Sequence, residues 1–330
     1  MDLTTDYLGL KLANPLVPSA SPLSKDIDSV RRLEDAGAAA IVMYSLFEEE
    51  VRAEDQFMDA YLYNQDIGHS EADSYRPVSV DYQTRTDEYL AHIFSLKQAV
   101  DIPVVASLNG VTTGGWIEHA LELQEAGADA LELNVYHVAA DITQSGQDIE
   151  QIYLDVLTAL RSQVRIPLVM KLSPYFSSVA NMVTILEDSG ADGVSLFNRF
   201  YQPSIDIETR AVSPELNLST SQESLLAMRW IAILSGKVNI TLAATGGVHT
   251  ADDVIRMVMA GADVTHMCSA LLINGPGYLG KVLAEVSGWL EENEYESIAQ
   301  LKGCTSQQHA LDPVAYERSN YMQVLNSYKP

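Results

Sequence analysis

The stretch Met259-Ala260-Gly261-Ala262-Asp263 ends an amphipathic segment and leads directly into the mostly apolar run 264–269. The same theme occurs three more times, at 34–38, 125–129 and 188–192. Glycine suits the left-handed backbone just past a helix, where a Cβ atom would be strained. The short apolar runs that follow are typical of strands buried on both faces. A repeated helix, glycine and buried strand predicts βα units around a parallel sheet.

Four further apolar runs complete a series of eight predicted strands, near 14–20, 38–44, 103–108, 129–135, 167–172, 193–198, 239–245 and 263–269. Helix-like segments alternate with them, at 26–36, 86–99, 115–126, 147–163, 177–189, 220–235, 251–260 and 276–292. This count predicts an α/β fold, a single (β/α)8 TIM barrel. A doubly wound open sheet is the alternative, but that fold carries its phosphate-binding glycines after the first strand. Here a diglycine follows the seventh strand, which favours the barrel.

The chain of 330 residues predicts two parts, a barrel over 1–303 and a C-terminal extension over 304–330 that packs on the barrel or on a partner subunit. A long loop, 46–85, follows the second strand, and 199–219 is a shorter insertion after the sixth. Both come at carboxyl ends of strands, where barrel enzymes build their sites. We expect the long loop to be a lid, a subunit contact or a solvated loop.

The net charge of −25 disfavours binding to nucleic acid or to anionic membranes, although solubility alone accounts for much of such a charge. Two cysteines are too few for a disulfide framework or for a four-cysteine iron–sulfur cluster. No signal peptide is apparent, and no apolar run approaches the length of about 20 residues that spans a membrane. We therefore expect a cytoplasmic protein that acts on a small molecule.

The diglycine Gly246-Gly247 ends the seventh predicted strand, and a helix is predicted to begin near Thr250. Glycine amides can approach a bound anion closely, and a helix start adds positive dipole. Cys268 and Ser269 end the eighth strand, the second strand of the usual barrel phosphate site. The pattern predicts a phosphate site, with a tight turn that binds nothing as the alternative.

Polar residues interrupt the fourth, fifth and sixth strands. With a period of two, Glu132 and Asn134 share one face of the fourth strand and leucines occupy the other. Lys171 lies within the apolar fifth strand, where it either neutralises Glu132 or offers positive charge to an anionic ligand. Because Asn198 ends the sixth strand, we expect Asn134, Lys171 and Asn198 to converge at the mouth of the barrel.

The chain resembles the dihydroorotate dehydrogenase family in six segments that follow in order from residue 1 to about residue 303. They read DLTTDYLGLKLANPLV, ELNV, VMKLSPYF, LFN, ATGGV and SIAQLKG. The resemblance implies an FMN-dependent barrel of pyrimidine biosynthesis that acts on a CH–CH bond. The sequence starts at the first hairpin, which resembles the soluble class 1 enzymes, and a homodimer is expected from the family.

By this resemblance seven residues surround the cofactor: Ala20, Ser21, Lys171, Gly246, Gly247, Cys268 and Ser269. The first two approach the flavin ring. Lys171 holds the N1–C2 edge and stabilises the anionic reduced form, and the last four surround the phosphate. Lys171 is thereby also one of two predicted catalytic residues.

The substrate side resembles the family less. Asn134 and Asn198 are expected to hold a pyrimidine-like ring over the flavin. His137 replaces the family's catalytic cysteine three residues after the first of these asparagines, and imidazole is a competent general base. Tyr44 replaces a lysine, and Arg199 replaces a small hydroxyl residue, and both are predicted to bind substrate. The family's Gly-Leu-Pro-Asn loop has no clear counterpart.

We therefore predict an FMN-dependent oxidoreductase that oxidises dihydroorotate or a similar ring, with His137 removing the C5 proton and hydride passing from C6 to the flavin. A flavin enzyme of the same scaffold with another substrate is nearly as well supported. A non-catalytic FMN-binding protein is a further alternative, as is a cofactor-free isomerase that grips a sugar phosphate at the diglycine. No metal is expected, and an NAD-linked reaction would need a partner subunit.

Overall fold

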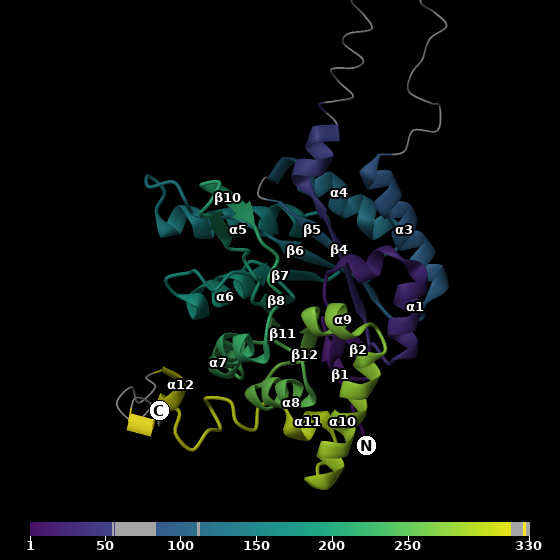
Figure 1. Cartoon of the computed structure of the whole chain (residues 1–330), viewed down its shortest axis with the longest axis vertical. Coiled ribbons are helices and arrows are strands. Elements are labelled where there is room, and N and C mark those ends of the chain that lie inside the picture. The colour runs from purple at the N-terminus through teal and green to yellow at the C-terminus, as the bar shows by residue number, and fades with distance from the viewer. Residues whose placement is uncertain (55, 57–83, 111–112, 318–325, 328–330) are drawn as a thin grey trace, which may run out of the picture.

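The computed structural model describes residues 1–54, 56, 84–110, 113–317 and 326–327. Eight parallel strands form one sheet in the order β3-β12-β11-β8-β7-β6-β5-β4, and helices surround it (Figure 1). The first and last strands of this order approach each other, so the sheet curves into a nearly closed barrel. The fold is the (β/α)8 TIM barrel that the repeated theme predicts.

The barrel strands are short, and nearly all of their residues are buried. They are β3 (Leu16–Pro18), β4 (Ile41–Phe47), β5 (Val104–Asn109), β6 (Ala130–Asn134), β7 (Leu168–Leu172), β8 (Gly193–Leu196), β11 (Thr241–Thr245) and β12 (Val264–Met267). Each overlaps a predicted strand. The largest offset is at β4, because the alanines at 38–40 form the turn that leads into the strand.

The main helices lie outside the strands and turn their apolar sides toward them. They are α1 (Ile27–Asp35), α3 (Arg85–Ala99), α4 (Thr113–Glu125), α5 (Gly146–Arg161), α6 (Val179–Asp188), α7 (Ser224–Leu234), α8 (Ala251–Ala260) and α10 (Tyr278–Glu292). The shorter ones are η1 (Pro22–Lys25), η2 (Ser221–Glu223), α9 (Ser269–Asn274), α11 (Ile298–Leu301) and α12 (Val314–Glu317). Capping boxes begin α3, α5 and α8 and satisfy their first amides.

The aspartate of the repeated theme ties neighbouring strands together at the amino end of the barrel. Asp129 accepts hydrogen bonds from the backbone amide of Val104, at 2.7 Å, and from Lys97 Nζ, at 2.7 Å. Asp192 and Asp263 repeat the arrangement, each with an amide near the start of the preceding strand and a basic side chain. The theme therefore supplies charge-assisted hydrogen bonds to backbone groups that would otherwise be unpaired.

The first copy of the theme has Ala39 in place of the aspartate, and Asn14 takes over its role. Asn14 Oδ1 accepts from the Leu16 amide at 2.9 Å, and its Nδ2 donates to the Gly37 carbonyl at 2.8 Å. The Ala39 amide in turn donates to the Leu16 carbonyl at 3.0 Å. These bonds join the two edge strands β3 and β4 where the barrel closes.

A hairpin of β1 (Thr5–Tyr7) and β2 (Leu10–Leu12) covers the amino end of the barrel. Its apolar side chains, among them Tyr7 and Leu8, pack against the inward-facing valines and alanines of the barrel strands. The Leu8 amide donates to Thr241 Oγ1 at 3.0 Å and anchors the hairpin to β11. The carboxyl end of the barrel is thus the end left for a ligand.

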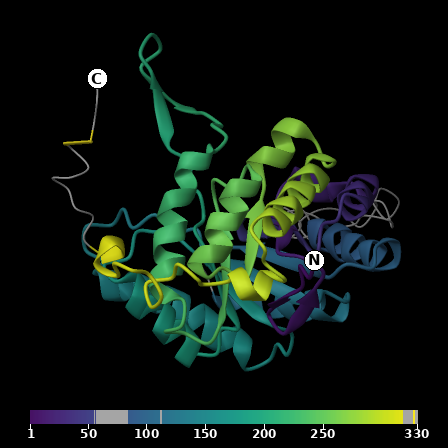
Figure 2. The same ribbon diagram turned by 90° about the horizontal axis from the view of Figure 1, so that it is seen from below.

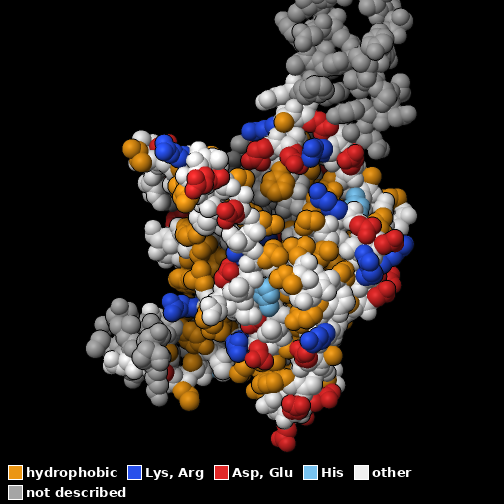
Figure 3. Space-filling view, viewed as in Figure 1, with side chains coloured by type: hydrophobic (Ala, Val, Ile, Leu, Met, Phe, Trp, Pro, Cys, Tyr) orange, Lys and Arg blue, Asp and Glu red, His pale blue; other side chains and the backbone are white. Residues whose placement is uncertain are grey.

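A second hairpin, β9 (Pro203–Asp206) and β10 (Ala211–Pro214), projects from the barrel within the predicted insertion (Figure 2). Ile205 and Val212 face each other across it and are 68% and 72% exposed. Most of the predicted loop after β4, residues 57–83, lies outside the described residues. On the face seen in Figure 3, charged side chains gather around the outline and apolar ones occupy the middle.

The described part of the C-terminal extension runs across α7 and α8. The Thr305 amide donates to the Met259 carbonyl at 3.0 Å, and the Gln307 amide donates to the Ala232 carbonyl at 2.9 Å. Within the described part of the chain, no helix has the length and apolarity needed to cross a membrane.

Candidate functional site

A row of buried polar side chains crosses four adjacent strands in the carboxyl half of the barrel. The sheet register places Asn109, Asn134, Lys171 and Ser195 side by side on β5, β6, β7 and β8. All four are at most 8% exposed. Sequence reasoning missed Asn109 and Ser195, although the alternation within their strands places both on the inner face.

Lys171 carries the one positive charge of this row. Its Nζ lies 3.1 Å from Oε1 of Glu132, which is fully buried one layer deeper in the barrel. The second carboxylate oxygen, Oε2, has no hydrogen-bond partner. The pairing that the sequence allowed is therefore present, and the lysine also occupies the row that faces the carboxyl end.

Two asparagines from different strands meet at the mouth. Nδ2 of Asn198, just after β8, donates to Oδ1 of Asn134 at 2.7 Å. The amide groups left over on both side chains can still donate and accept, which suits a ring that carries carbonyl and N–H groups. His137 lies in the loop after β6, and its Nε2 is buried without a partner.

Three segments converge beside this mouth and form a cradle, residues 219–224, 246–249 and 268–269. The Ser219 amide donates to Ser269 Oγ at 3.1 Å, and Ser219 Oγ lies 2.9 Å from His249 Nε2. Gly246 and Gly247 have φ values of +93° and +74°, which favour glycine. A Cβ atom at Gly247 would overlap the backbone nitrogen of Ser224.

Ser219 was missed in the sequence because 199–219 lacks a periodic pattern. One signal was available, since Thr220 and Glu223 form a capping box at the start of η2. That signal places a chain turn directly after Ser219.

The start of α8 differs from expectation. Asp253 is 1% exposed, and its Oδ2 accepts from the amides of His249, at 3.1 Å, and Thr250, at 3.0 Å. The protein's own carboxylate therefore occupies these two amides, and its negative charge opposes the positive end of α8. The N-cap of α9, Cys268, makes no side-chain capping bond, so α9 is the better placed helix start.

The residues predicted to approach the flavin ring lie next to this helix start. Cys268 Sγ is 4.0 Å from the carbonyl oxygen of Ala20, so the ends of β12 and β3 meet there. Ser21 Oγ accepts from the Leu23 amide and caps η1. Burial raises the pKa of the Cys268 thiol, which therefore stays neutral and does not repel a phosphate.

Tyr44, predicted to bind substrate, lies at the shifted register of β4, and its role in substrate binding stays a prediction. The register of β4 shifts between Val42 and Ser45, so that Ser45 faces inward and its Oγ lies 2.9 Å from Ser107 Oγ. The Tyr44 ring packs instead on the α3 side, edge-on to Tyr89 at 4.9 Å between ring centroids. A bulge of this kind redirects a side chain without any sign in the local sequence.

Arg199 is turned toward the cradle. Its Nη1 lies 3.3 Å from Oε2 of Glu223, which is an ion-pair distance, although the atoms are not aligned for a hydrogen bond. The neighbouring Phe200 packs on Tyr136 in a tilted arrangement, at 4.2 Å between ring centroids, and meets Tyr175 edge-on. An aromatic wall thus stands beside His137 on the substrate side.

Beneath the row, two more buried polar groups face Glu132. His266 and Tyr7 pack edge-on at 6.1 Å, and neither Nε2 of the histidine nor the tyrosine hydroxyl has a partner. Burial lowers the pKa of His266 to about 4. Burial, and then the Glu132 charge, raise the pKa of Tyr7. Both groups are therefore neutral near pH 7.

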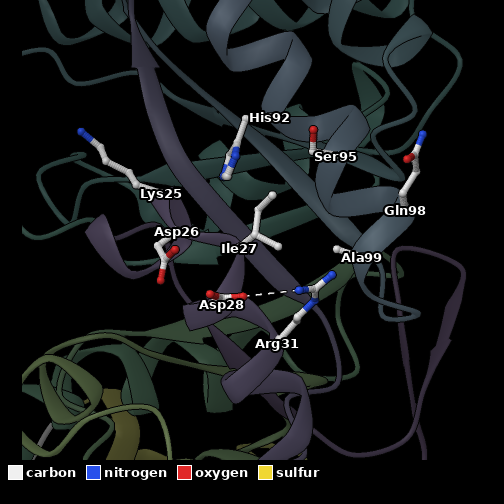
Figure 4. A pocket seen from close by; sticks show the side chains of 9 residues that line it. All are labelled: Lys25, Asp26, Ile27, Asp28, Arg31, His92, Ser95, Gln98 and Ala99. Carbon is white, nitrogen blue, oxygen red and sulfur yellow. Dashed lines mark hydrogen bonds and ion pairs between the residues drawn. The ribbon is translucent and has the colours of Figure 1, made fainter.

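A shallow hollow of about 600 Å³ lies on the outer flank, between α1 and α3 (Figure 4). Its lining mixes charges of both signs, and Arg31 and Asp28 pair along its α1 side at 3.3 Å. It contains none of the predicted site residues. Among the described residues, no three His, Cys, Asp or Glu side chains are grouped to hold a metal ion.

The residues present fit a phosphorylated flavin. The diglycine lets α7 approach in a way that a Cβ would prevent, and the start of α9 is left uncapped. A buried ammonium faces the same end of the barrel as two unpartnered polar atoms, Glu132 Oε2 and His137 Nε2. The ammonium and the helix start are donors suited to an anionic phosphate and an electron-rich ring, whereas the Glu132 carboxylate can only accept.

Comparison with known proteins shows the family to which the chain is similar. The family model for dihydroorotate dehydrogenase matches residues 78–290. A dihydroorotate dehydrogenase B (NAD(+)) catalytic subunit of Thermoplasma volcanium is 25% identical over 320 residues, which cover 92% of this chain and 98% of that protein. One of Shouchella clausii, and a putative dihydroorotate dehydrogenase A (fumarate) of Aeropyrum pernix, are each 29% identical and cover 62% of this chain and 68% of their own lengths.

Proposed function

Because the chain belongs to the dihydroorotate dehydrogenase family, we propose that it oxidises dihydroorotate or a closely similar ring at a CH–CH bond. Enzymes of this family depend on FMN, which, when bound, supplies the hydride acceptor. One observation carries the proposal: the buried Lys171 ammonium stands in one row with Asn134 at the open end of the barrel.

On the cofactor side, we assign the phosphate to the cradle formed by Gly246, Gly247, Cys268 and Ser269, and we add Ser219 to it. Ala20 and Ser21 would lie against the ring, and the Lys171 charge would balance the negative charge of its reduced form. The uncapped start of α9 and the left-handed diglycine support this assignment.

On the substrate side, Asn134 and Asn198 would orient the ring through their free amide groups. His137 would take the C5 proton on Nε2, which is buried and has no competing partner. Arg199 would lie at the edge of this space. The aromatic wall beside His137 would exclude water from the proton transfer.

A flavin spectrum and anaerobic reduction by dihydroorotate test the proposal. We expect the purified protein to retain FMN, and the flavin to bleach when dihydroorotate is added without oxygen. His137→Ala should retain FMN and reduce it at least 100-fold more slowly. His119→Ala on α4 is the matched control, because that histidine pairs with Glu122, outside the mouth. An unchanged rate in His137→Ala would remove this residue as the base.

A second candidate is a flavin enzyme of the same scaffold that acts on a different ring. The tilted pair of Tyr136 and Phe200, with Arg199 next to Phe200, favours this candidate, because it brings aromatic rings and a guanidinium to the substrate side in addition to the amides. Retained FMN that dihydroorotate does not bleach, but another cyclic amide or acid does, would select this candidate.

We further propose a cytoplasmic homodimer, with a barrel over 1–303 and a C-terminal extension over 304–330. The exposed pair Ile205 and Val212 on the projecting hairpin supports a contact between copies. Sedimentation tests it, since Ile205→Asp should shift the protein toward a monomer. An unchanged dimer would place the contact elsewhere.

A further inference from the structure

We propose that Glu132 is a positioning residue for the flavin: it holds the Lys171 ammonium at the open end of the barrel and offsets part of its charge, which keeps the flavin's reduction potential low. The inference rests on the proposed function, in which Lys171 lies against the flavin. It assigns a role to a carboxylate that the proposed reaction itself does not use.

Burial makes this carboxylate unusual. Glu132 is fully buried, and Lys171 is 7% exposed, so water cannot screen either charge. Their atoms approach to 3.1 Å, and the two residues come from adjacent strands, β6 and β7. A buried ion pair is weak as a source of stability, because desolvation costs about as much as the attraction returns. Its retention calls for another role.

The surroundings give Glu132 no other cation among the described residues. The groups that face it are Tyr7, Tyr89, His266 and Lys171. Burial keeps both tyrosines in the neutral phenol form, and His266 is neutral near pH 7. The Glu132 charge therefore acts on Lys171 and on whatever Lys171 touches.

The geometry also fixes where the ammonium lies. Glu132 stands one layer below Asn134 on the same strand, and Lys171 is the register neighbour of Asn134. The lysine reaches from the upper layer down to Oε1, so its position is set between the buried carboxylate and the mouth. Without Glu132, a flexible lysine chain with three rotatable donors would lose this restraint.

The charge balance predicts the sign of the effect. With Glu132 ionised, the pair presents little net charge to the flavin. With a neutral glutamine, the full Lys171 charge acts in a poorly screened interior, where unit charges interact strongly. Anionic forms of the flavin then become more stable. The same change would strengthen the addition of sulfite to flavin N5, because that adduct is also anionic.

Glu132→Gln tests the proposal on the FMN-loaded protein, with the flavin midpoint potential and the sulfite dissociation constant as readouts. We expect a higher potential and about tenfold tighter sulfite binding. Glu132→Asp should stay near the wild-type values, because it keeps the charge. Ser107→Ala, a neutral change in the neighbouring strand position, is the matched control and should shift neither quantity.

Equal potentials in Glu132→Gln and the wild type would overturn the proposal, as would an equal shift in Ser107→Ala. If Glu132→Gln does not fold, Glu132→Met, which also removes the charge and has a side chain of similar length, is measured with the same readouts, and an unchanged potential there is equally contradictory. Failure of the proposed function is distinguishable, because the wild-type protein would then either retain no FMN or retain FMN that dihydroorotate does not bleach, whereas the potential and the sulfite affinity need only bound FMN.

Discussion

The amino end of the barrel differs from the rest of its interior in whether the polar side chains have hydrogen-bond partners. At the amino end, Asp129, Asp192 and Asp263 each accept from a strand amide and from a basic side chain. In the barrel interior above the hairpin and at the carboxyl end, by contrast, several side chains each keep a buried atom without a partner: Tyr7, Glu132, His137, Arg199 and His266. Unpaired buried polar groups cost stability. The difference indicates that the amino end serves the fold and the carboxyl half serves a ligand.

The largest expected effect is the acid sensitivity of the carboxyl half. The pKa of His266 is about 4 in the folded protein against about 6.5 when unfolded. Below pH 6.5 the unfolded chain binds a proton that the folded protein does not, so stability falls as the pH drops toward 4. The loss is about 3 kcal/mol. Urea unfolding at pH 7 and pH 4 measures this loss of unfolding free energy. In the variant His266→Asn, the loss that is due to His266 should be absent.

The next effect tests the amino end. Asp263→Ala removes the partner of the Leu242 amide and of Lys302, and should cost about 2 kcal/mol of unfolding free energy. FMN affinity of the folded protein should not change. Asp188→Ala is the control, because this carboxylate is exposed at the end of α6. Weaker FMN binding in Asp263→Ala alone would mean that the two ends are not separate in role.

Alanine substitutions at Gly246 and Gly247 separate two effects within the cradle, backbone strain and steric overlap. Gly246→Ala meets only the strain of a positive φ, about 1 kcal/mol, because its nearest neighbour, the Phe197 carbonyl, is 3.7 Å from the added carbon. Gly247→Ala meets the same strain and an overlap with Ser224. We expect FMN to bind at least ten times more weakly in Gly247→Ala than in Gly246→Ala, by fluorescence titration. Equal affinities in the two variants would show that the close approach of α7 to Gly247 does not contribute to FMN binding.

The smallest expected effect on stability is at the mouth. Asn198→Ala removes one hydrogen bond to Asn134 at a partly exposed position, so unfolding free energy should fall by under about 1 kcal/mol. Flavin reduction by substrate should fall much more. Thermal unfolding and stopped-flow reduction on the same preparations compare the two. A large loss of stability would assign Asn198 to the fold.

The fold could be predicted from the repeated theme, because each strand that follows the theme is buried on both faces and is therefore mostly apolar. The inner positions of Glu132, Asn134 and Lys171 also followed, since alternation along a strand is a local property. The orientation of the Tyr44 side chain could not be predicted in this way, because the bulge in β4 depends on pairing with β5. The place of Ser219 in the cradle could not be predicted either, since its partners His249 and Ser269 are 30 and 50 residues away in the sequence.

The hairpin that covers the amino end has a consequence for how the chain is made. Its anchor joins Leu8 to Thr241, 233 residues later, and Thr5 bonds to Asp263 across 258 residues. A ribosome adding about 5–20 residues per second needs on the order of ten seconds or more to supply these partners. Throughout that interval Tyr7 and its apolar neighbours have no barrel to enter. The segment synthesised first is therefore among the last to find its place.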